Sequence, residues 1–580
     1  MSIKNIFFFI FVSSLLAISF AYNKSFFIII GFIFLIVLAF KKFGYKIPII
    51  LVGVFLFFCF YRINRIDKTL NNTSISCNAT IYEVKNTYIL IKDQNNNNYL
   101  VYIKDDISYQ KEDIISINGQ IKLIENDLEL DVFDFKEYLN NKRVYYQISD
   151  YKINIIKKDN SLSAKIIDFI TKRLKGNSLS MTKMLLFSDK TADVETYNNL
   201  KEINALHLFV VSGFHISFFF NILQLIFKKN KYLKIIIPCS FIFFYVFLLD
   251  FSISATRAFL TLVLSLLFKK YLNKLDCISI TGILFLLIEP LNIFNYSFIM
   301  SYLMTITITF TSNAIKNQNK LLQLLITSLI CFLAMIPIQL LLNYKINFIS
   351  LFTNIILSYI VLFIFILCLL GLPLSLISGN LFGGIYSVFN NFVSKISDIN
   401  LSITFGSLNS FAIVIYYGIL LLLLYYIETK KVKRIGLVIY FIFLFMICLY
   451  NRHLFIYYQQ VTFLNVYQGD CAIIQDSFNG KVMLIDTGGL LNYDIANKKI
   501  MPYLNYHGIR KIDIVVISHE DYDHCGALET LKSSIRIKQI IKNPAIDSVS
   551  LGKIYLENLN HYYNESSISS SGVSSKSKTQ

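Results

Sequence analysis

Four side chains that often bind metal ions lie within six positions of one another near the end of the chain. They follow the apolar run IDIVVIS and are His519, Asp521, Asp523 and His524. Imidazole and carboxylate groups at this density suit a pair of divalent cations, which can activate water and hold a phosphodiester or acyl substrate for hydrolysis. The alternative is a polar loop whose histidines fall there by chance. Because the chain has only seven histidines and two lie here, the pattern favours a hydrolase-type metal site.

A second group of polar residues lies in an apolar run, residues 204–227, which is long enough to cross a bilayer. On a helix with about 100° per residue, one stripe of roughly 140° would hold Asn204, His207, Ser212 and His215. Polar groups in lipid must find partners. The stripe therefore predicts either a helix contact sealed by hydrogen bonds or the wall of a pore or substrate path, and the pattern weighs the two about equally.

Three charged residues lie at or near the ends of other apolar runs. Small residues surround Arg257 in SATRAF, so a neighbouring helix or a strand of phosphates could approach it closely, and we hypothesise that it grips an anion. Asp250 and Glu289 lie where apolar runs end. A charge in such a position usually anchors a helix end at the membrane interface.

The composition excludes a wholly soluble protein. Apolar residues make up 55% of the 580 positions, and the mean hydropathy is +0.55, above the range of soluble domains. The net charge is +18, from 55 Lys and Arg against 37 Asp and Glu. Such an excess suits either the anchoring of cytoplasmic loops or a polyanionic partner.

The chain divides into five segments that differ in residue pattern, and these must position the residues above. Three apolar runs (1–61) predict membrane helices that stay in the mature protein. Short alternating runs separated by Asn, Asp and Gly clusters (62–160) predict a small antiparallel β domain, with an OB-like barrel as one candidate. A second helical block (161–458) predicts nine crossings and an uncertain turn between 371 and 400. Residues 459–565 read as strands, loops and helices of an α/β domain, and the Ser-rich end (566–580) predicts a disordered tail.

The helical block carries its basic residues in alternate loops. The expected crossings lie near 203–227, 233–250, 252–270, 276–289, 297–311, 321–343, 346–370, 410–427 and 435–457. Pro337 and Pro373 are expected to kink or interrupt their helices. If the basic loops are cytoplasmic, the β domain and the segment after residue 458 face outward.

Taken together, these motifs resemble the ComEC competence family, bacterial membrane proteins that bring single-stranded DNA into the cell during natural transformation. The motifs that carry the resemblance follow one another in the family's order. They are FDFKEYL (133–139), LHLFVVSGFHI (206–216), SATRAFL (254–260), EPLNIFNYSFIMSY (289–302), FLNVYQGD (463–470), LIDTGG (484–489) and DYDHCGA (521–527).

The resemblance implies a polytopic helical membrane protein with an external OB-like domain and a C-terminal metallo-β-lactamase-like domain. It implies a DNA channel in the membrane, and a β-lactamase-like domain that degrades the other strand. Four residues, with Asp523 and His524 as the catalytic pair, would bind zinc or manganese: His519, Asp521, Asp523 and His524. Asp486 would orient that site, and Asp470 would support it. The implied partners are single-stranded DNA, the membrane, other competence proteins and a second copy of the chain.

The chain departs from the family pattern in ways that affect the metal site. In FLNVYQGD, Asn465 and Tyr467 replace the usual Asp and Gly of the family, and Cys525 and Ala527 flank Gly526 where a hydrophobe and a second Gly are common. The further metal ligands expected downstream are missing, with only His561 following the loop. We therefore expect a truncated domain that exposes IDIVVIS, is poorly stable, and binds metal weakly or not at all.

Three functions remain open on this evidence. In the first, the membrane domain is a DNA uptake channel lined by His207, Ser212, His215 and Arg257. In the second, the helices only anchor a metal-dependent hydrolase or nuclease that acts outside the membrane. In the third, the protein is a small-solute permease. A nonfunctional remnant is a further alternative.

Overall fold

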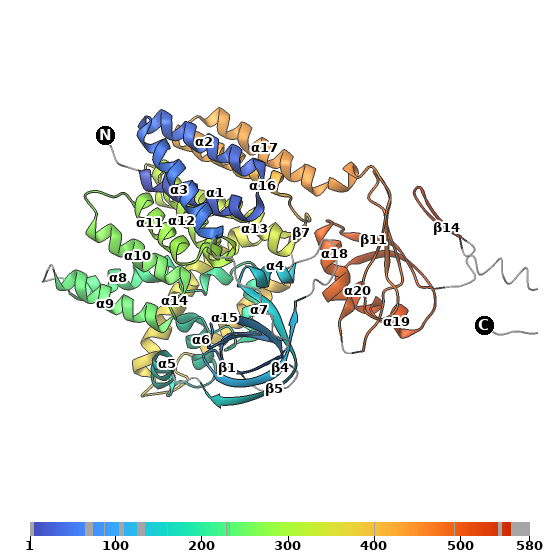
Figure 1. Ribbon diagram of the computed structural model, residues 1–580, viewed down its shortest axis with the longest axis horizontal. Coiled ribbons are helices and arrows are strands. Elements are labelled where there is room, and N and C mark those ends of the chain that lie inside the picture. The colour runs from blue at the N-terminus through green and yellow to red at the C-terminus, as the bar shows by residue number, and fades with distance from the viewer. Residues whose placement is uncertain are drawn as a thin grey trace, which may run out of the picture. The chain divides into compact units, whose positions relative to one another are not determined.

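The computed structural model describes residues 5–63, 74–85, 87–103, 109–124, 134–158, 161–227, 230, 232–399, 401–491, 493–542 and 548–557. The chain forms two compact units, and each is described by itself. The first is built mainly from residues up to 334 and from 347 to 401, and the second from 335–346 and from 402 onward. In Figure 1 the first unit runs from the blue N-terminal helices to yellow, and the second holds the orange and red elements.

Three N-terminal helices open the first unit. They are α1 (Ile6–Asn23), α2 (Phe26–Phe43) and α3 (Lys46–Ile63). Helix α1 packs against both of the others and against α11 (Lys274–Ile288). The contact with α11 is close because Phe11 lies over Gly282, where a β-carbon would overlap its ring. A glycine at this crossing lets an aromatic side chain reach the neighbouring backbone.

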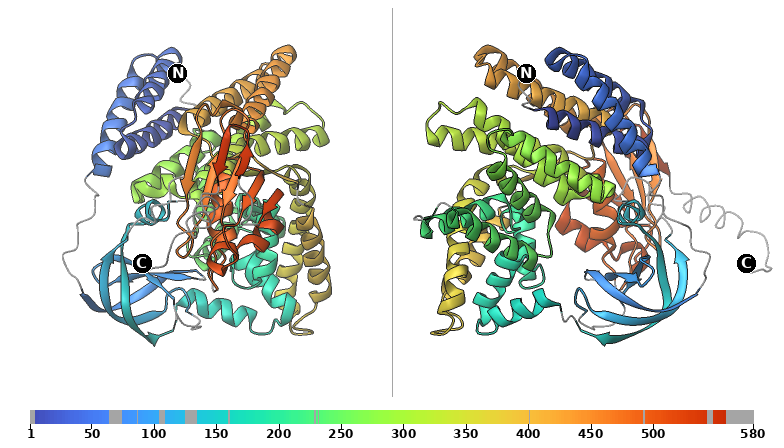
Figure 2. Two further views of the ribbon diagram at one scale, coloured as in Figure 1. Left: turned by 90° about the vertical axis from the view of Figure 1, so that its right-hand side faces the viewer. Right: turned by 60° about the vertical axis from the view of Figure 1, so that its left-hand side comes forward.

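A small closed barrel follows, with strand order β1-β2-β3-β5-β4. Its strands are β1 (Ser74–Val84), β2 (Tyr88–Asp93), β3 (Asn98–Tyr102), β4 (Ile114–Leu123) and β5 (Val144–Lys157), with α4 (Phe135–Asn140) before β5. Alternating residues such as Ile81, Ile91 and Ile117 fill the interior. The strands pair antiparallel except β3 with β5, which are parallel. The antiparallel domain expected from the sequence is therefore wrong at this pair, and the barrel as a whole can be seen in blue in Figure 2.

Two ion pairs join the barrel to the ends of membrane helices. Lys111 Nζ lies 2.7 Å from Asp250 Oδ2, in the link between α9 (Leu233–Leu248) and α10 (Ile253–Leu267). Arg143 Nη2 lies 3.0 Å from Glu289 Oε2, between α11 and the 3₁₀ helix η2 (Pro290–Phe294). The link at Asp250 is tight, because Asp250 and Phe251 both have positive φ. The barrel therefore lies on the same side of these helices as both acidic links.

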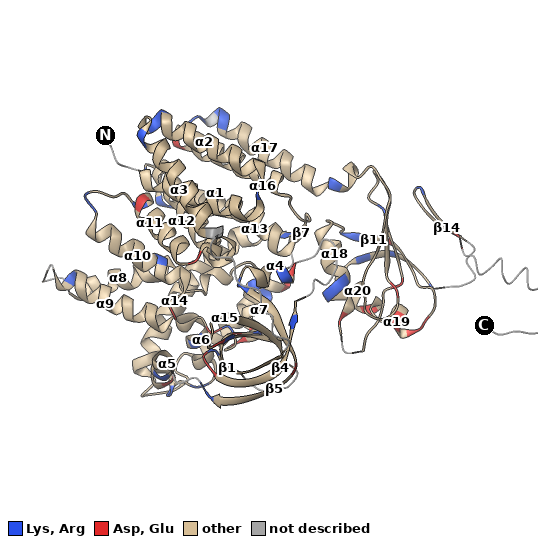
Figure 3. Cartoon of the chain, in the orientation of Figure 1, with Lys and Arg blue, Asp and Glu red and all other residues tan. Residues whose placement is uncertain are grey.

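The helical block contains short helices in addition to those long enough to be membrane crossings. They are α5 (Leu162–Thr171), α6 (Gly176–Phe187), α7 (Val194–Glu202), η1 (Leu206–Leu208), α8 (Gly213–Ile226), α12 (Tyr296–Ala314), α13 (Lys320–Asn343), α14 (Ser350–Leu374), α15 (Gly383–Asp398), α16 (Ser410–Glu428) and α17 (Val432–Tyr450). Among the described residues, seven stretches are long and apolar enough to span a membrane, and three shorter apolar helices accompany them. Figure 3 shows most of the helix surface tan, with blue near several helix ends.

The two prolines expected to kink or interrupt their helices differ in position. Helix α13 continues past Pro337 to Asn343, so an interruption there is wrong, whereas α14 ends at Leu374, directly after Pro373. The expected kinks stay predictions. Membrane helices tolerate proline because neighbouring groups satisfy the freed carbonyl.

The second unit has a five-stranded sheet in the order β12-β11-β10-β9-β8. The strands are β8 (Gln460–Phe463), β9 (Ala472–Gln475), β10 (Val482–Ile485), β11 (Lys511–Val516) and β12 (Arg536–Ile541). The π-helix η4 (Ala496–Ile500) leads into α18 (Met501–Tyr506), and α19 (Tyr522–Cys525) and α20 (Leu528–Ser534) follow β11. The strands β10, β11 and β12 are parallel to one another. Strand β9 is antiparallel to β10, and β8 is antiparallel to β9.

Both faces of this sheet are covered where the structure describes it. On one face Leu484 and Val515 pack with residues of η4, α18 and α20. On the other, Met483 and Ile514 pack with the hairpin β13 (Ser548–Leu551) and β14 (Ile554–Glu557). The expectation that IDIVVIS is exposed is therefore wrong, because its strand is buried from both sides.

Asp476 attaches this hairpin to the sheet. Its Oδ2 accepts a hydrogen bond from the backbone N–H of Lys553 at 3.1 Å and another from Asn479 Nδ2, while its Oδ1 accepts bonds from Gln459 Nε2 and the N–H of Ser477. The side chain is 1% exposed. Burial acts to raise the pKa of Asp476, but these hydrogen bonds outweigh it and hold the pKa below its ordinary value of 3.8.

We expect Asp476→Asn to loosen the hairpin at neutral pH, because an amide cannot accept all four hydrogen bonds; the cost should be about 1–3 kcal/mol. A lowered carboxyl pKa contributes stability above the ordinary value and loses it as pH falls through the folded-state pKa. The wild-type hairpin should therefore keep its protection down to about pH 4 and lose it below. Hydrogen exchange of residues 548–557 in the full chain measures both effects. Asp494→Asn, at an exposed helix start, is the matched control, and equal exchange in the two variants would contradict the prediction.

Candidate functional site

The polar loop of the second unit lies where two parallel strands end. Asp486 directly follows β10, and Ser518 comes two residues after β11. The two chain segments are joined there by the N–H of Asp486, which donates to the Val516 carbonyl at 2.8 Å. Neighbouring parallel strands bring the residues after their carboxyl ends to one edge of a sheet. This topology brings LIDTGG and SHEDYDH together, although they are more than thirty residues apart in sequence.

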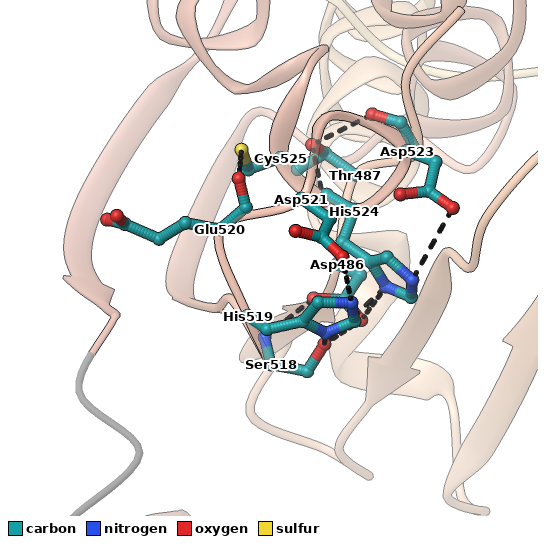
Figure 4. A network of polar contacts seen from close by, with 10 residues as sticks. Asp486, Thr487, Ser518, His519, Glu520, Asp521, Asp523, His524 and Cys525 are labelled. Carbon is teal, nitrogen blue, oxygen red and sulfur yellow. Dashed lines mark hydrogen bonds and ion pairs between the residues drawn. The ribbon is translucent and has the colours of Figure 1, made fainter.

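Asp486 is the centre of this network (Figure 4). Its Oδ1 accepts a hydrogen bond from the N–H of Ser518 at 2.7 Å, and its Oδ2 accepts one from Ser518 Oγ, also at 2.7 Å. His524 Nδ1 lies 2.9 Å from Oδ2. The side chain of Asp486 is 5% exposed. It therefore fixes both the start of the loop and the ring of His524.

The two histidines of the loop differ in environment. The hydrogen bond to Asp486 raises the pKa of His524, burial opposes the rise, and the charges of Asp486, Asp523 and Asp470 add to it. The pair therefore stabilises the fold most at pH values below the ordinary histidine pKa and weakens as the ring loses its proton. His519 is exposed, and its Nδ1 lies 2.9 Å from Ser518 Oγ. The two imidazole rings are 3.9 Å apart.

The remaining acidic side chains lie farther from the rings. His519 Nε2 is 3.4 Å from Asp521 Oδ2, and His524 Nε2 is 3.8 Å from Asp523 Oδ2. Asp470 is exposed and acts on His524 through its charge. The site thus gathers two imidazoles and four carboxylates, counting Asp486, without joining all of them to one point.

These residues are suited to a divalent metal by type but not by arrangement. Imidazole and carboxylate are ligands of zinc and manganese. Among the described residues, however, no group of three or more His, Cys, Asp or Glu side chains is placed to hold a metal ion. The raised pKa of His524 also favours a proton that a metal would have to displace. The arrangement does not fit a metal centre, and we derive no metal-dependent step from it.

Three glycines let the loop pack against its neighbours. A β-carbon on Gly469 would overlap the Asp523 carbonyl oxygen, and one on Gly489 would overlap that of Tyr522. At Gly526 a β-carbon would be 2.9 Å from Gly489 Cα. The glycines of the motifs QGD, DTGG and HCG therefore share one role, the close approach of three backbone segments.

In the membrane domain the stretch 204–227 is not one helix. Asn204 has a positive φ of 55°, η1 covers only three residues, and α8 begins at Gly213. Ser212 and His215 form a capping box, in which the N–H of Ser212 donates to His215 Nδ1 at 3.2 Å. The predicted stripe is therefore wrong as a helical face. His207 is exposed and faces the carbonyl of Asn204, whereas His215 is buried.

Arg257 is buried beside the start of α8. Its side chain is 5% exposed, and its Nη1 donates to Thr305 Oγ1 of α12 at 2.6 Å. Its guanidinium carbon lies 5.8 Å from the centre of the Tyr302 ring. A β-carbon added to Gly213, the first residue of α8, would be 3.3 Å from Arg257 Nη2. The structure thus places Arg257 next to Ser212 and His215 through the first turn of α8, and leaves His207 outside this group.

Sequence reasoning missed two partners of these residues. Ser518 binds Asp486, and its position between a buried strand and His519 was the available signal. Thr305 receives the hydrogen bond of Arg257 from 48 positions away, and no local pattern marks it.

Two family models match the chain. The model for a competence protein matches residues 185–430, which contain α8, Arg257 and Thr305. The model for the metallo-beta-lactamase superfamily matches residues 464–548, which contain the polar loop. Both matches agree with the order of motifs found in the sequence.

Three curated proteins are similar to parts of the chain. An uncharacterized protein of Mycoplasma genitalium, MG316, is 36% identical over 26% of this chain and 42% of its own length, and its Mycoplasma pneumoniae homolog is 30% identical over 26% and 41%. ComE operon protein 3 of Bacillus subtilis is 23% identical over 70% of this chain and 57% of its own length. The chain thus spans about half the length of the relatives it matches, and no solved structure matches it. The chain thus carries a region similar to a competence protein, followed by a region similar to the metallo-beta-lactamase superfamily, and much of its length is similar to ComE operon protein 3.

Proposed function

We propose that this protein moves single-stranded DNA across the cytoplasmic membrane during natural transformation. The observation that carries the proposal is the buried Arg257. A cation among apolar helices is costly unless an anion accompanies it, and Arg257 makes no ion pair with any acidic residue that the structure describes. A negatively charged substrate entering the competence domain would supply the missing charge.

The contacts of the barrel support an outward orientation for it. The ion pairs to Asp250 and Glu289 lie at the starts of α10 and η2, whereas Lys269, Lys270 and Lys316 follow the opposite ends of α10 and α12. If the basic ends are cytoplasmic, the barrel faces outside. The strand order with a parallel β3–β5 pair supports an OB-like barrel, a fold that often holds single strands.

The roles of the individual residues follow from this function. Arg257 contacts the strand, and Ser212 and His215 set the start of α8 beside it. His207, exposed on the preceding turn, lies at the edge of the path. The C-terminal domain acts on DNA outside the membrane only if residues 519–524 acquire a metal, and zinc or manganese is the ion to test. Other competence proteins and a second copy of the chain are further proposed partners.

Proteoliposomes containing the full chain test the proposal. A labelled oligothymidylate is added outside, and a single-strand binding protein enclosed in the lumen traps what enters. We expect the wild type to accumulate protected DNA and Arg257→Gln to reduce accumulation at least tenfold. Arg434→Gln, a surface arginine of α17, is the matched control and should transport normally.

The same vesicles separate the alternatives. A small-solute permease would admit a fluorescent anion of low mass and leave the oligonucleotide outside. A membrane-anchored nuclease would release nucleotides outside, in a manner dependent on added zinc or manganese, without accumulation. Equal accumulation by the wild type and Arg257→Gln would refute the assigned role of Arg257, and no accumulation by either would refute the function.

A further inference from the structure

We propose that Arg257 and the first turn of α8 together form a site for one phosphate group of the nucleic-acid strand. This inference rests on the proposed function for the identity of its occupant. It specifies the chemical group that is bound, the residues that bind it and the number of groups held at a time.

The start of α8 and the side chain of Arg257 are both positively charged and lie close together. The N-terminus of a helix carries a partial positive charge, because the N–H groups of its first turn have no partner within the helix. Helix α8 has 14 residues and begins inside the apolar block. Arg257 Nη2 lies 3.3 Å from the position of a β-carbon on Gly213, the first residue of that helix. Two positive groups close together at low dielectric repel each other, and an anion that both can reach would be attracted by each of them.

Arg257 has hydrogen-bond donors that lack acceptors. A guanidinium has five N–H donors. In the described structure its side chain makes one hydrogen bond, to Thr305, and Nε has no partner although the side chain is 95% buried. Buried donors without acceptors are rare in folded proteins. In the capping box the Ser212 hydroxyl accepts the N–H of His215. The donors of Arg257 that remain, together with the N–H groups of Gly213 and Phe214, suit a tetrahedral oxyanion with several acceptor oxygens.

His215 and Thr305 hold the proposed site in place from two sides. The N–H of Ser212 donates to His215 Nδ1, so in the neutral ring the proton is on Nε2, which is buried and has no partner in the described structure. His215 thereby fixes where α8 begins, and its Nε2 is a donor rather than an acceptor. On the opposite side, Thr305 holds the guanidinium while its own hydroxyl donates to the Ser301 carbonyl at 2.7 Å. The acceptor role of Thr305 toward Arg257 is therefore fixed.

The absence of a side chain at Gly213 lets the guanidinium approach the first turn of α8 closely. A methyl group there would lie 3.3 Å from Arg257 Nη2 and 3.7 Å from Ala258 Cβ. Gly213→Ala therefore keeps every charge and crowds the contact between the guanidinium and the helix. It is the variant that separates a ligand site from a purely structural arginine.

The experiment measures binding of an oligothymidylate to the full chain in nanodiscs of phosphatidylcholine at several salt concentrations. Each phosphate contact on a single strand contributes about 0.7 to the slope of log K against log salt. We expect Arg257→Gln and Gly213→Ala each to weaken binding about tenfold or more and to reduce the slope by about 0.7, the value for one phosphate. Arg434→Gln should leave both unchanged.

A second measurement guards against loss of folding and identifies the source of the phosphate. Hydrogen exchange of residues 206–220 reports the start of α8 directly. An oligothymidylate should protect it in the wild type and not in Gly213→Ala, whereas a methylphosphonate oligomer, which has the same bases but a neutral backbone, should protect neither. Thr305→Val should bind with an intermediate affinity.

The outcomes are distinguishable from failure of the proposed function. If the wild type binds the oligomer and both variants keep its slope, the site is wrong while the function stands. If the wild type binds no oligomer but inorganic phosphate protects residues 206–220, the anion site stands and the function is wrong. If protection instead requires phosphatidylglycerol in the nanodisc, the occupant is a lipid headgroup and the assignment to nucleic acid is overturned.

Discussion

Replacing Asp486 by Asn is expected to disorder the loop at residues 518–525 and to destabilise the C-terminal domain by about 2–4 kcal/mol. The carboxylate accepts two hydrogen bonds from Ser518 and faces the ring of His524. An amide offers one acceptor oxygen, so its NH₂ group would oppose either a donor of Ser518 or the ring. Because the side chain is 5% exposed, water cannot take over the lost bonds.

Pulse proteolysis of the full chain in detergent, with hydrogen exchange of residues 511–528, measures this loss. Glu529→Gln is the matched control, since it makes the same change at an exposed site of α20 and removes only a surface ion pair with Lys532. We expect the control to change stability by less than about 0.5 kcal/mol. If Asp486→Asn behaves like the control, the network around Asp486 does not hold the loop.

The second large effect is expected at Gly469. This residue has a φ of 78°, a conformation that costs other residues about 1–2 kcal/mol. An alanine methyl group would also overlap the Asp523 carbonyl oxygen, and such overpacking adds about 1–3 kcal/mol. Gly469→Ala should therefore displace residues 521–526 and accelerate their proteolysis at least tenfold.

Limited proteolysis followed by peptide mapping checks this prediction. Gly418→Ala in α16 is the control, because a β-carbon there meets no atom within 4 Å. Alanine is also the better helix former, so the control should be neutral or slightly stabilising. Cleavage of Gly469→Ala at the control rate would show that the turn can shift away from Asp523 at little cost.

The elements that hold the polar loop could be anticipated from the sequence because the signal is local. Alternation and apolar runs mark the strands, and polar residues at strand ends mark the loop. The partner of Asp486 followed only once β10 and β11 were known to be adjacent and parallel. The burial of IDIVVIS was missed because its cover comes from the β13–β14 hairpin, a segment with little sequence signature of its own.

In the membrane domain the sequence predicted the positions of the helices but not the breaks and contacts between them. Hydropathy located the helices well, because length and apolar content are properties of a continuous segment. It could not show the break before α8, since hydropathy describes side chains and the break depends on the backbone of Asn204 and on the cap at Ser212. The contact of Arg257 with Thr305 could not be predicted either, because it joins two helices whose pairing no sequence pattern indicates.

The two ion pairs of the barrel have a thermodynamic consequence for Arg257. Lys111 holds the tight link that begins α10, the helix of Arg257, and Arg143 holds the turn that leads into α12, the helix of Thr305. Binding free energies at linked sites are reciprocal. If a ligand that draws Lys111 or Arg143 away from its carboxylate changes the anion affinity at Arg257 by some factor, an anion at Arg257 must change the affinity of the barrel for that ligand by the same factor.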